Sequence, residues 1–295
     1  MSQALASKKN VVLVGVDGSA SSRRAVRVAI DEAMRRDATV HMLYAIRPLY
    51  GLTGLDPTQD EEEMSEYRGN LDKYIARMER ENPGVKITSE ITIEAPAYAL
   101  VKASHHADLM VLGGRSHNPL AGMVLGSVTN KVLPYSACPV IVSHDREHVA
   151  NGPVIVGMAP ETGSPNAVRF AFEEALLRDN DLKIISGRQH TSVTASLLRS
   201  RTRRQRVDDA NAYAALRNTK AVEEIAKDYP DVNYEIIIVP DHAADVLVDK
   251  SDEASITIVG TQGSLTPSGL IGSVSLAVLR EAPLVVVVPE NTDED

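Results

Sequence analysis

Two segments of the chain have the glycine and serine spacing of a loop that could hold a phosphate group. Residues 108–128 read DLMVLGGRSHNPLAGMVLGSV, and residues 255–274 read SITIVGTQGSLTPSGLIGSV. Each contains an apolar run, a corner glycine (Gly113 or Gly260), a polar loop and then Gly-Ser-Val entering a helical pattern. Glycine lets the backbone turn sharply and approach a ligand, and the N–H groups at the start of a helix attract anions. The pattern is typical of a strand, loop and helix that bind phosphate, the alternative being glycines that only turn the chain.

A carboxylate and two hydroxyls accompany the first of these segments. Asp17 follows the apolar run Val11–Val16 and could accept hydrogen bonds from a ribose hydroxyl or hold a metal-bound water. The hydroxyls of Ser127 and Thr129 can add donors at the start of the helix. Ligands of parallel α/β sheets bind beyond the carboxyl ends of the strands, so the loops after this run and after Leu112 are expected to share one crevice. The sequence contains neither a Walker-type phosphate loop nor a dinucleotide-binding fingerprint after the first strand.

The repetition extends beyond these loops and predicts a tandem duplication. Each half opens with a buried-strand run that ends at a glycine. An Ala-rich segment with helical spacing follows, AVRVAIDEAMRRD in the first half and AVRFAFEEALLRD in the second. Each half also closes with a β-branched run after a proline. The repeat is too long for a solenoid, so each copy is expected to be a whole domain with its own core. We predict one domain at 1–147 and a second at 148–295.

Apolar runs and helical spacing alternate along the first half. Strands are expected at Val11–Val16, Thr39–Ile46, Val85–Ile93, Leu109–Leu112 and Val140–Val142, and helices at Ser21–Arg36, Glu61–Arg80, Ala97–Ser104 and Gly126–Leu133. Ser21 or Ser22 is the expected N-cap of the first helix. This alternation predicts an α/β fold in which each of the two tandem domains has a five-stranded parallel sheet with helices on both faces. The last strands, at 140–142 and 284–288, are expected at sheet edges, where exposed strands invite pairing.

Composition disfavours several classes of function. The net charge of −9 argues against nucleic-acid binding, because contacts to phosphates need clustered Lys and Arg. One such cluster runs from Arg199 to Arg206, and we interpret it as a solvated loop or helix start, the alternative being a loop that contacts an anion or a partner. No apolar stretch approaches the length of a membrane span and no export signal is visible, so we expect no membrane insertion. The single cysteine, Cys138, is expected to be a small core residue, and the lack of any intrachain disulfide predicts a cytoplasmic protein.

Histidines near the fourth expected strand do not have metal-ligand spacing. His105 and His106 lie just before that strand with Asp108 close behind, and no third and fourth ligand follows at a matching distance. We expect both to be surface or helix-end residues, and His41 to be a partly buried packing residue on its strand. No metal site and no catalytic residue is predicted, and no nucleophile-elbow motif occurs.

Four short motifs together resemble the universal stress protein family. They are Val14-Gly15-Val16-Asp17-Gly18-Ser19 at the first strand, Ala107-Asp108-Leu109 at the fourth, Gly113 followed by Gly126-Ser127-Val128, and Ala137-Cys138-Pro139-Val140 before the last. The resemblance covers both halves, so the chain is similar to a tandem universal stress protein. It implies the adenine-nucleotide α-hydrolase-like fold, with the last strands of the two domains pairing as a pseudo-dimer. In the nucleotide-binding branch it also implies ATP held by a loop of glycine, two residues, glycine, nine residues, and then glycine with serine or threonine.

In the first half, the resemblance implies a nucleotide site made by three strand ends and the loop. Its residues are Gly15, Val16, Asp17, Ala45, Leu112, Gly113, Arg115, Ser116, Gly126, Ser127 and Val128. Val16, Asp17 and Ala45 would lie near the ribose and base, and Leu112 would contact the adenine side. The second glycine position of the loop is Ser116. If this position needs a positive φ, binding weakens, whereas with a negative φ the hydroxyl can donate to a phosphate.

In the second half, the resemblance implies the loop residues Gly260, Gly263, Gly272 and Ser273. This loop is one residue shorter than the motif and contains a proline. The position of Asp17 is taken by Ala159, so the acceptor for the ribose is missing. We therefore expect the first domain to bind nucleotide more tightly, and the second to bind weakly or not at all.

Three functions remain open at this point. The first is a cytoplasmic stress-response protein that binds ATP, ADP or AMP with Mg2+ and does not turn it over efficiently, because no general base or arginine clamp is visible. The second is a ligand-free regulatory scaffold, supported by Ser116 and Ala159. The third, an ATP-using enzyme of the related α-hydrolase type, needs an S-G-G-x-D-S-type loop where this chain has Asp17-Gly18-Ser19-Ala20. We expect a homodimer of tandem chains, and the sequence identifies no protein partner.

Overall fold

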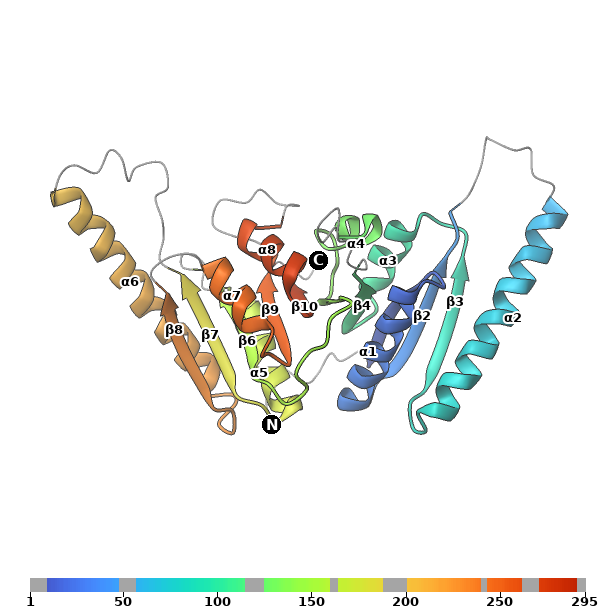
Figure 1. The fold of residues 1–295 in the computed structure, drawn as a ribbon, viewed down its shortest axis with the longest axis horizontal. Coiled ribbons are helices and arrows are strands. Elements are labelled where there is room, and N and C mark those ends of the chain that lie inside the picture. The colour runs from blue at the N-terminus through green and yellow to red at the C-terminus, as the bar shows by residue number, and fades with distance from the viewer. Residues whose placement is uncertain are drawn as a thin grey trace. The chain divides into compact units, whose positions relative to one another are not determined.

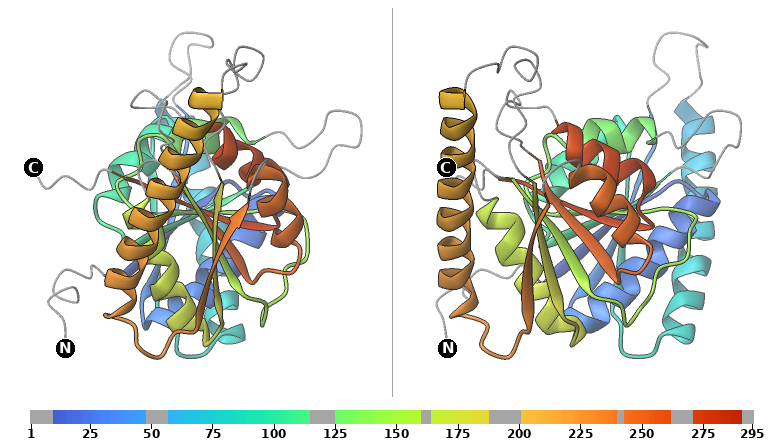
Figure 2. Two further views of the ribbon diagram at one scale, coloured as in Figure 1. Left: turned by 90° about the vertical axis from the view of Figure 1, so that its left-hand side faces the viewer. Right: turned by 60° about the vertical axis from the view of Figure 1, so that its left-hand side comes forward.

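The computed structural model describes residues 10–47, 57–114, 125–159, 164–187, 201–239, 243–261 and 271–290. The chain divides into two compact units, and the division in the described chain lies between Ser143 and His144. In each unit strands alternate with helices, as Figure 1 shows and Figure 2 shows from two further sides. His144 belongs to the second unit because its backbone N–H donates to the Pro283 carbonyl at 3.0 Å and its Nε2 lies 2.8 Å from the Leu279 carbonyl.

The first unit contains five strands and four helices in its described residues. In chain order they are β1 Val11–Val16, α1 Ala20–Arg36, β2 Thr39–Ala45, α2 Pro57–Glu81, β3 Ile87–Thr92, α3 Pro96–Ser104, β4 Leu109–Gly113, α4 Ser127–Val132 and β5 Val140–Ser143. The predicted elements are all present, with ends that differ by a few residues. The largest difference is at the start of α2, which was expected at Glu61 and begins at Pro57. This position tolerates proline because its N–H would be unpaired there.

The second unit repeats this order. Its elements are β6 Val154–Met158, α5 Pro165–Arg178, β7 Leu182–Gly187, α6 Arg201–Ala226, β8 Tyr234–Val239, α7 Ala243–Ser251, β9 Ile256–Gly260, α8 Ser273–Glu281 and β10 Leu284–Val288. The arginine cluster predicted as a loop or helix start falls at the beginning of α6 from Arg201 on, and Arg199 lies outside the described residues. Among the described residues, no helix is both long and apolar enough to cross a membrane.

Strand order is the same in both units. It runs β3-β2-β1-β4-β5 in the first and β8-β7-β6-β9-β10 in the second, and the paired strands within each unit are parallel. The predicted tandem α/β fold is therefore confirmed, and β5 and β10 each end the sheet of their own unit. Strand order reverses between β1 and β4, and such reversals open a crevice beyond the carboxyl ends of the two strands. The pairing of β5 with β10 stays a prediction.

Helices cover both faces of the first sheet, as consecutive residues of β4 demonstrate. A Cβ on Gly113 would point at Ser21 of α1, whereas the Leu112 side chain packs beside Gly15 and Leu100 on the face covered by α3. The core between these layers is built mainly from fully buried Val, Leu, Ile and Ala side chains. Aromatic residues contribute little to it, since the chain has no Trp and 2 Phe.

The N-cap of α1 differs from the prediction. The cap is Ser19 rather than Ser21 or Ser22, and its hydroxyl oxygen accepts from the Ser22 backbone N–H at 3.1 Å. Ser19 has an extended backbone with φ −71° and ψ 166°, which is the conformation that a cap residue needs. The helix therefore begins at Ala20, one residue closer to β1 than its apolar spacing indicates.

Candidate functional site

A cavity lies at the carboxyl ends of β1, β2 and β4, where the strand order reverses. Its volume is about 190 Å3. It is lined by Gly15, Val16, Asp17, Ser21, Ser22, Leu43, Ala45, Pro96, Leu100, Leu112, Gly113, Val128 and Thr129. Seven of the residues predicted for the first site are among them: Gly15, Val16, Asp17, Ala45, Leu112, Gly113 and Val128. Four segments that are distant in sequence thus meet in one cavity.

The turn from β1 into α1 positions the only carboxylate in this lining. Gly18 has φ +77°, a conformation that side chains other than glycine rarely adopt, and it reverses the chain directly after Asp17. The Ser19 backbone N–H then donates to Asp17 Oδ1 at 3.0 Å, and Ser19 Oγ lies 2.9 Å from Ser21 Oγ. Asp17 and the first residues of α1 therefore form one hydrogen-bonded turn.

Hydrogen bonds hold the Asp17 carboxyl in its ionised form. Burial raises the pKa of Asp17, but donors from the Ser19 hydroxyl, the Ser19 backbone and the Ser22 hydroxyl together outweigh burial, so the pKa lies below its ordinary value of 3.8. At neutral pH the group is a carboxylate, which accepts hydrogen bonds and donates none. Because Asp17 is exposed, it can also accept donors from a ligand in the cavity.

Gly113 is required by packing as well as by the turn. A Cβ at this position would lie 2.7 Å from the Ser21 carbonyl carbon and 2.8 Å from its oxygen, so any side chain would push α1 away from β4. The Gly113 carbonyl lies 3.5 Å from the buried Thr129 hydroxyl, which connects the end of β4 with α4. The Gly114 backbone N–H donates to the Ser143 carbonyl at 2.8 Å and continues the pairing with β5.

Gly126 is different, because the fold itself does not require a glycine there. Its φ of −59° and ψ of 148° suit any residue, and it caps α4 without a side-chain hydrogen bond. A Cβ would meet, among the described atoms, only the Thr129 hydroxyl oxygen at 3.5 Å, an ordinary contact. Ser127 follows as the exposed first residue of α4. The space that a side chain would fill at Gly126 is therefore open on the described side.

Three predicted site residues lie outside the described residues. They are Arg115, Ser116 and Gly263. Both expectations for Ser116, weaker binding with a positive φ and a hydroxyl donor with a negative φ, therefore stay predictions.

The corresponding corner of the second unit has a different environment. Ala159 carries no acceptor; its backbone N–H donates to the Ser164 hydroxyl at 3.3 Å. Gly260 ends β9 and its carbonyl accepts from Ser275 Oγ at 2.8 Å, as Gly113 pairs with Thr129 in the first unit. A Cβ on Gly260, however, would lie 2.4 Å from an oxygen of the Glu290 carboxyl. Gly272 and Ser273 begin α8, as Gly126 and Ser127 begin α4.

Glu290 brings an acid to this second corner. Its backbone is held by the Thr261 hydroxyl, which accepts from its N–H at 3.3 Å, and by Asn166, which donates to its carbonyl at 2.8 Å. Its Oε1 is buried without a hydrogen-bond partner among the described residues. Burial raises the pKa of Glu290 above its ordinary value of 4.5. A carboxylate at this place opposes the approach of a phosphate.

Sequence reasoning missed five residues of the first cavity. They are Ser21, Ser22, Leu43, Pro96 and Leu100. Leu43 could have been found, because it shares a strand face with Ala45 at the spacing of two residues. Pro96 and Leu100 come from α3, and no local signal connects that helix with the ends of β1 and β4.

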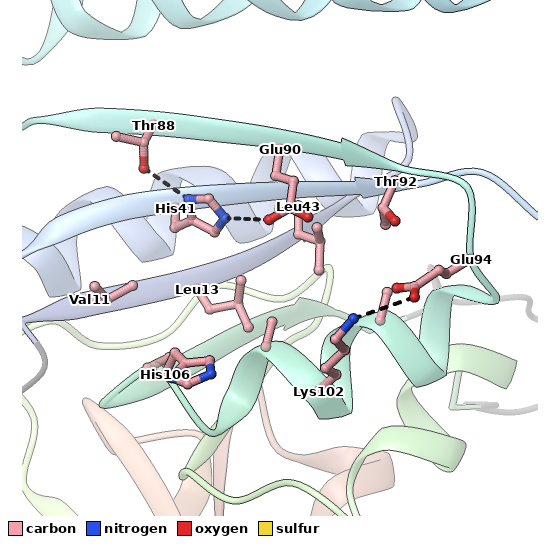
Figure 3. Close-up of a pocket in the computed structure, with 13 residues that line it drawn as sticks. Val11, Leu13, His41, Leu43, Thr88, Glu90, Thr92, Glu94, Lys102 and His106 are labelled. Carbon is pink, nitrogen blue, oxygen red and sulfur yellow. Dashed lines mark hydrogen bonds and ion pairs between the residues drawn. The ribbon is translucent and has the colours of Figure 1, made fainter.

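A second groove adjoins this cavity on the α3 face of the sheet, and Figure 3 shows it. Both are lined by Leu43. His41 lies between Thr88 and Glu90, with Nδ1 2.9 Å from the Thr88 hydroxyl and Nε2 3.6 Å from the Glu90 carboxylate (Figure 3). It is partly buried, as predicted. The charged residues that line the groove are two glutamates, Glu90 and Glu94, and one lysine, Lys102.

The other residues with reactive side chains have structural roles or lie at the surface. Cys138 is buried, with its sulfur 3.8 Å from the Ser136 hydroxyl oxygen, which confirms the predicted core position. His105 caps the carboxyl end of α3, and both it and His106 are exposed, as helix-end residues were expected to be. Among the described residues, no three His, Cys, Asp or Glu side chains are grouped closely enough to hold a metal ion.

Comparison with known proteins agrees with the repeat. The universal stress protein family model matches residues 9–144 and again residues 151–289. A universal stress protein of Mycolicibacterium smegmatis is 30% identical over 94% of this chain and 97% of its own length. One from Mycobacterium tuberculosis is 29% identical over 93% of this chain and 95% of its own length.

The fold agrees as well. The crystal structure of a universal stress protein from Archaeoglobus fulgidus matches with a TM-score of 0.71 at 20% identity, covering 96% of this chain and 99% of that one. The two family matches leave few residues of the chain unassigned, and each falls on a unit with the same strand order. The chain is therefore a member of the universal stress protein family, with two such domains in tandem.

Proposed function

We propose that the first domain binds an adenine nucleotide, with ATP and its Mg2+ as the principal ligand, and that this stress protein acts by binding rather than by turnover. The observation that carries the proposal is the cavity in which Asp17, Ala45, Leu112 and Gly113 meet. An apolar wall beside an ionised carboxylate suits a base and its ribose. The open space at Gly126 fits the close approach of a phosphate.

Each wall of the cavity has a role in this proposal. Val16, Ala45 and Leu112 would enclose the base, and Asp17 would accept hydrogen bonds from a ribose hydroxyl. The segment from Gly113 to Gly126 would hold the phosphates, and the bound Mg2+ would neutralise part of their charge. The described cavity, about 190 Å3, is smaller than the volume of about 300–1,000 Å3 typical of ligand sites, so the proposal assigns only the base and ribose to it.

We infer that the second domain binds nucleotide weakly or not at all. Ala159 offers no acceptor to a ribose, and the Glu290 carboxyl lies against Gly260, the corner that would face the phosphates. Two negatively charged groups in one partly buried corner repel each other, so a triphosphate would have to displace or protonate Glu290.

A ligand-free scaffold is the alternative function. The substituted loop position Ser116 and the missing carboxylate at Ala159 favour it. An ATP-using enzyme of the related α-hydrolase type has less support, because the turn after β1 is Asp17-Gly18-Ser19-Ala20. We also propose a cytoplasmic location, on the ground that the chain has a single, buried cysteine and therefore no intrachain disulfide.

Calorimetric titration of the full chain with ATP and Mg2+ tests the proposal. We expect saturable binding and a higher Tm with ligand, because a ligand of the native state stabilises it. Asp17→Asn should weaken binding about tenfold, the value of one hydrogen bond to a charged group. The matched control is Asp72→Asn, which removes the same charge from the exposed surface of α2 and should bind as wild type.

Two results would contradict the proposed nucleotide site. One is the absence of both heat and Tm shift at millimolar ATP, which favours the scaffold. The other is equal binding by wild type and Asp17→Asn, which would remove the carboxylate from the site.

A further inference from the structure

A groove between α1 and α2 has a strongly positive lining. Its volume is about 510 Å3. The floor is apolar, because Ile30 and Met78 are only 2% and 5% exposed. The lining residues are Ala20, Arg23, Arg24, Arg27, Ile30, Asp31, Tyr74, Arg77, Met78, Glu81 and Asn82. Four arginines thus face two carboxylates, in a chain whose net charge is −9.

Helical spacing brings these arginines together. Arg23 and Arg27 are one turn apart on α1 with Arg24 beside them, and Arg77 faces them from α2. The Arg77 guanidinium lies 5.2 Å from the centre of the Tyr74 ring and its Nε is 3.7 Å from the Glu81 carboxylate. The Arg23 guanidinium donates to the Gly18 carbonyl. The guanidinium groups of Arg23 and Arg77 are therefore held at the groove by the Gly18 carbonyl, the Tyr74 ring and the Glu81 carboxylate.

The positive charge of this groove affects the pKa of Tyr74. Burial raises the pKa of its hydroxyl, and the nearby guanidinium groups of Arg77, Arg27 and Arg23 act in the opposite direction. All three arginines are therefore close enough to the half-buried ring to stabilise a negative charge beside it.

The second unit provides an internal comparison, because the repeat aligns Arg27 with Arg169 and Ile30 with Phe172. There the space above the sheet is filled: Tyr229 stacks on Phe172 with ring centres 5.5 Å apart. Arg169 is paired with Asp228 at 3.1 Å, which ties α5 to the end of α6. The Tyr229 hydroxyl donates to Glu173 at 3.2 Å.

The same alignment shows that the cluster of positive charges occurs in the first unit and not at the matching positions of the second. The positions of Arg23, Arg24 and Arg77 are occupied by Pro165, Asn166 and Glu224. The two copies have therefore diverged in opposite directions, one to a closed aromatic contact and the other to an open cationic groove. Packing of the shared fold does not require four arginines at this place.

From this divergence we infer that the groove between α1 and α2 is a binding site for a small polyanion, a molecule with at least two phosphate or carboxylate groups. The planar guanidinium fork pairs with two oxygens of such groups, which a lysine cannot do. The volume lies within the range of about 300–1,000 Å3 found for small-molecule sites. The aromatic face of Tyr74 and the apolar floor leave room for an organic body between the charged groups.

Titration of the full chain with inorganic pyrophosphate and, separately, with citrate tests this site and distinguishes phosphate from carboxylate ligands. We expect saturable binding of at least one probe that weakens with added salt. The double variant Arg27→Gln with Arg77→Gln should lose about tenfold or more in affinity, since it removes two charged hydrogen-bonding groups. Arg80→Gln removes one charge from the same helix outside the groove and should bind as wild type.

The nucleotide cavity must be excluded as the place where the probe binds. The Gly126→Asp variant, which places a negative charge where the nucleotide phosphates would lie, should bind the probe as wild type does; loss of probe binding in it would overturn the inference. So would an equal loss in Arg80→Gln and in the double variant, or no binding of either probe at low salt. The far-UV spectrum and Tm of the double variant show whether it is folded. If the double variant does not fold, the single variant Arg77→Gln replaces it and is expected to lose less affinity. Because neither probe contains a base, failure of the nucleotide proposal leaves this result interpretable.

Discussion

Asp17, Ser19 and Ser22 form one hydrogen-bonded turn, and this turn illustrates what can be read from single residues. The sequence predicts that Asp17 ends a strand beside a crevice, because strand length and polarity are local properties. It does not predict that Ser19 caps α1, since Ser19, Ser21 and Ser22 are all suitable cap residues and geometry chooses among them. Leu100 joins the cavity through packing of a distant helix, which no local pattern encodes.

Glu290 gives a pH prediction at this scale. Its pKa is raised in the folded protein, so ionisation favours the unfolded state. The contribution of the neutral carboxyl to stability is fully present below the ordinary value of 4.5 and is lost as pH rises through the raised value. We therefore expect Glu290→Gln to be more stable than wild type at neutral pH, with an advantage that disappears at lower pH.

Urea unfolding at several pH values measures this difference. Glu223→Gln, an exposed substitution on α6, is the matched control and should follow wild type at each pH. A wild-type advantage at neutral pH would show that Glu290 is stabilised as a carboxylate, contrary to its buried and unpartnered oxygen.

The packing of α1 on β4 gives a second explanation for the glycine at position 113, beside the approach of a ligand. The sequence assigns Gly113 to the ligand, as a corner that lets phosphate approach. The structure adds that α1 and β4 approach so closely at Ser21 that no Cβ fits. Existence and order of the elements follow from alternating apolar runs, but the distance between a helix and a strand depends on the packed layers, and the sequence does not reveal it.

Gly113→Ala tests this contact between elements. The added methyl must displace the first turn of α1, so we expect the free energy of unfolding to fall by about 1–3 kcal/mol, as for other overpacked sites. Gly126→Asp is the contrast: its backbone angles suit an N-cap and aspartate is among the best cap residues, so stability should not fall. Urea denaturation of both variants provides the measurement. An equal loss in the two variants would contradict the packing explanation.

At the scale of the whole chain, the duplication determines the fold and the differences between copies determine the sites. Both units keep the strand order, the corner glycine and the hydroxyl that bonds its carbonyl. They differ at Asp17 against Ala159, at the Glu290 carboxyl, and in the groove beside the first helix of each unit. The repeat and these residue differences are visible in the sequence, whereas the position of Glu290 against Gly260 depends on how the end of the chain folds back on the second unit.

This asymmetry predicts the stoichiometry of nucleotide binding. The titration uses the double variant Arg27→Gln with Arg77→Gln, in which the groove between α1 and α2 no longer offers a second site for the phosphates of ATP. In this variant we expect one ATP per chain, because only the first unit combines a carboxylate with an open corner. Asp17→Asn should weaken that single event and reveal no second one of comparable strength. Two equal sites per chain would show that Ala159 and Glu290 do not hinder binding in the second unit.

Gly126 has a consequence for work in living cells. Because its backbone is ordinary and the described space around it is open, an aspartate there should leave the abundance and folding of the protein intact while placing a negative charge against incoming phosphate. The Gly126→Asp allele would thus separate the effect of having the protein from the effect of nucleotide bound to it. If cells carrying this allele behave like a deletion strain under stress, the phenotype belongs to the bound ligand; if they behave like the parent, it belongs to the protein surface.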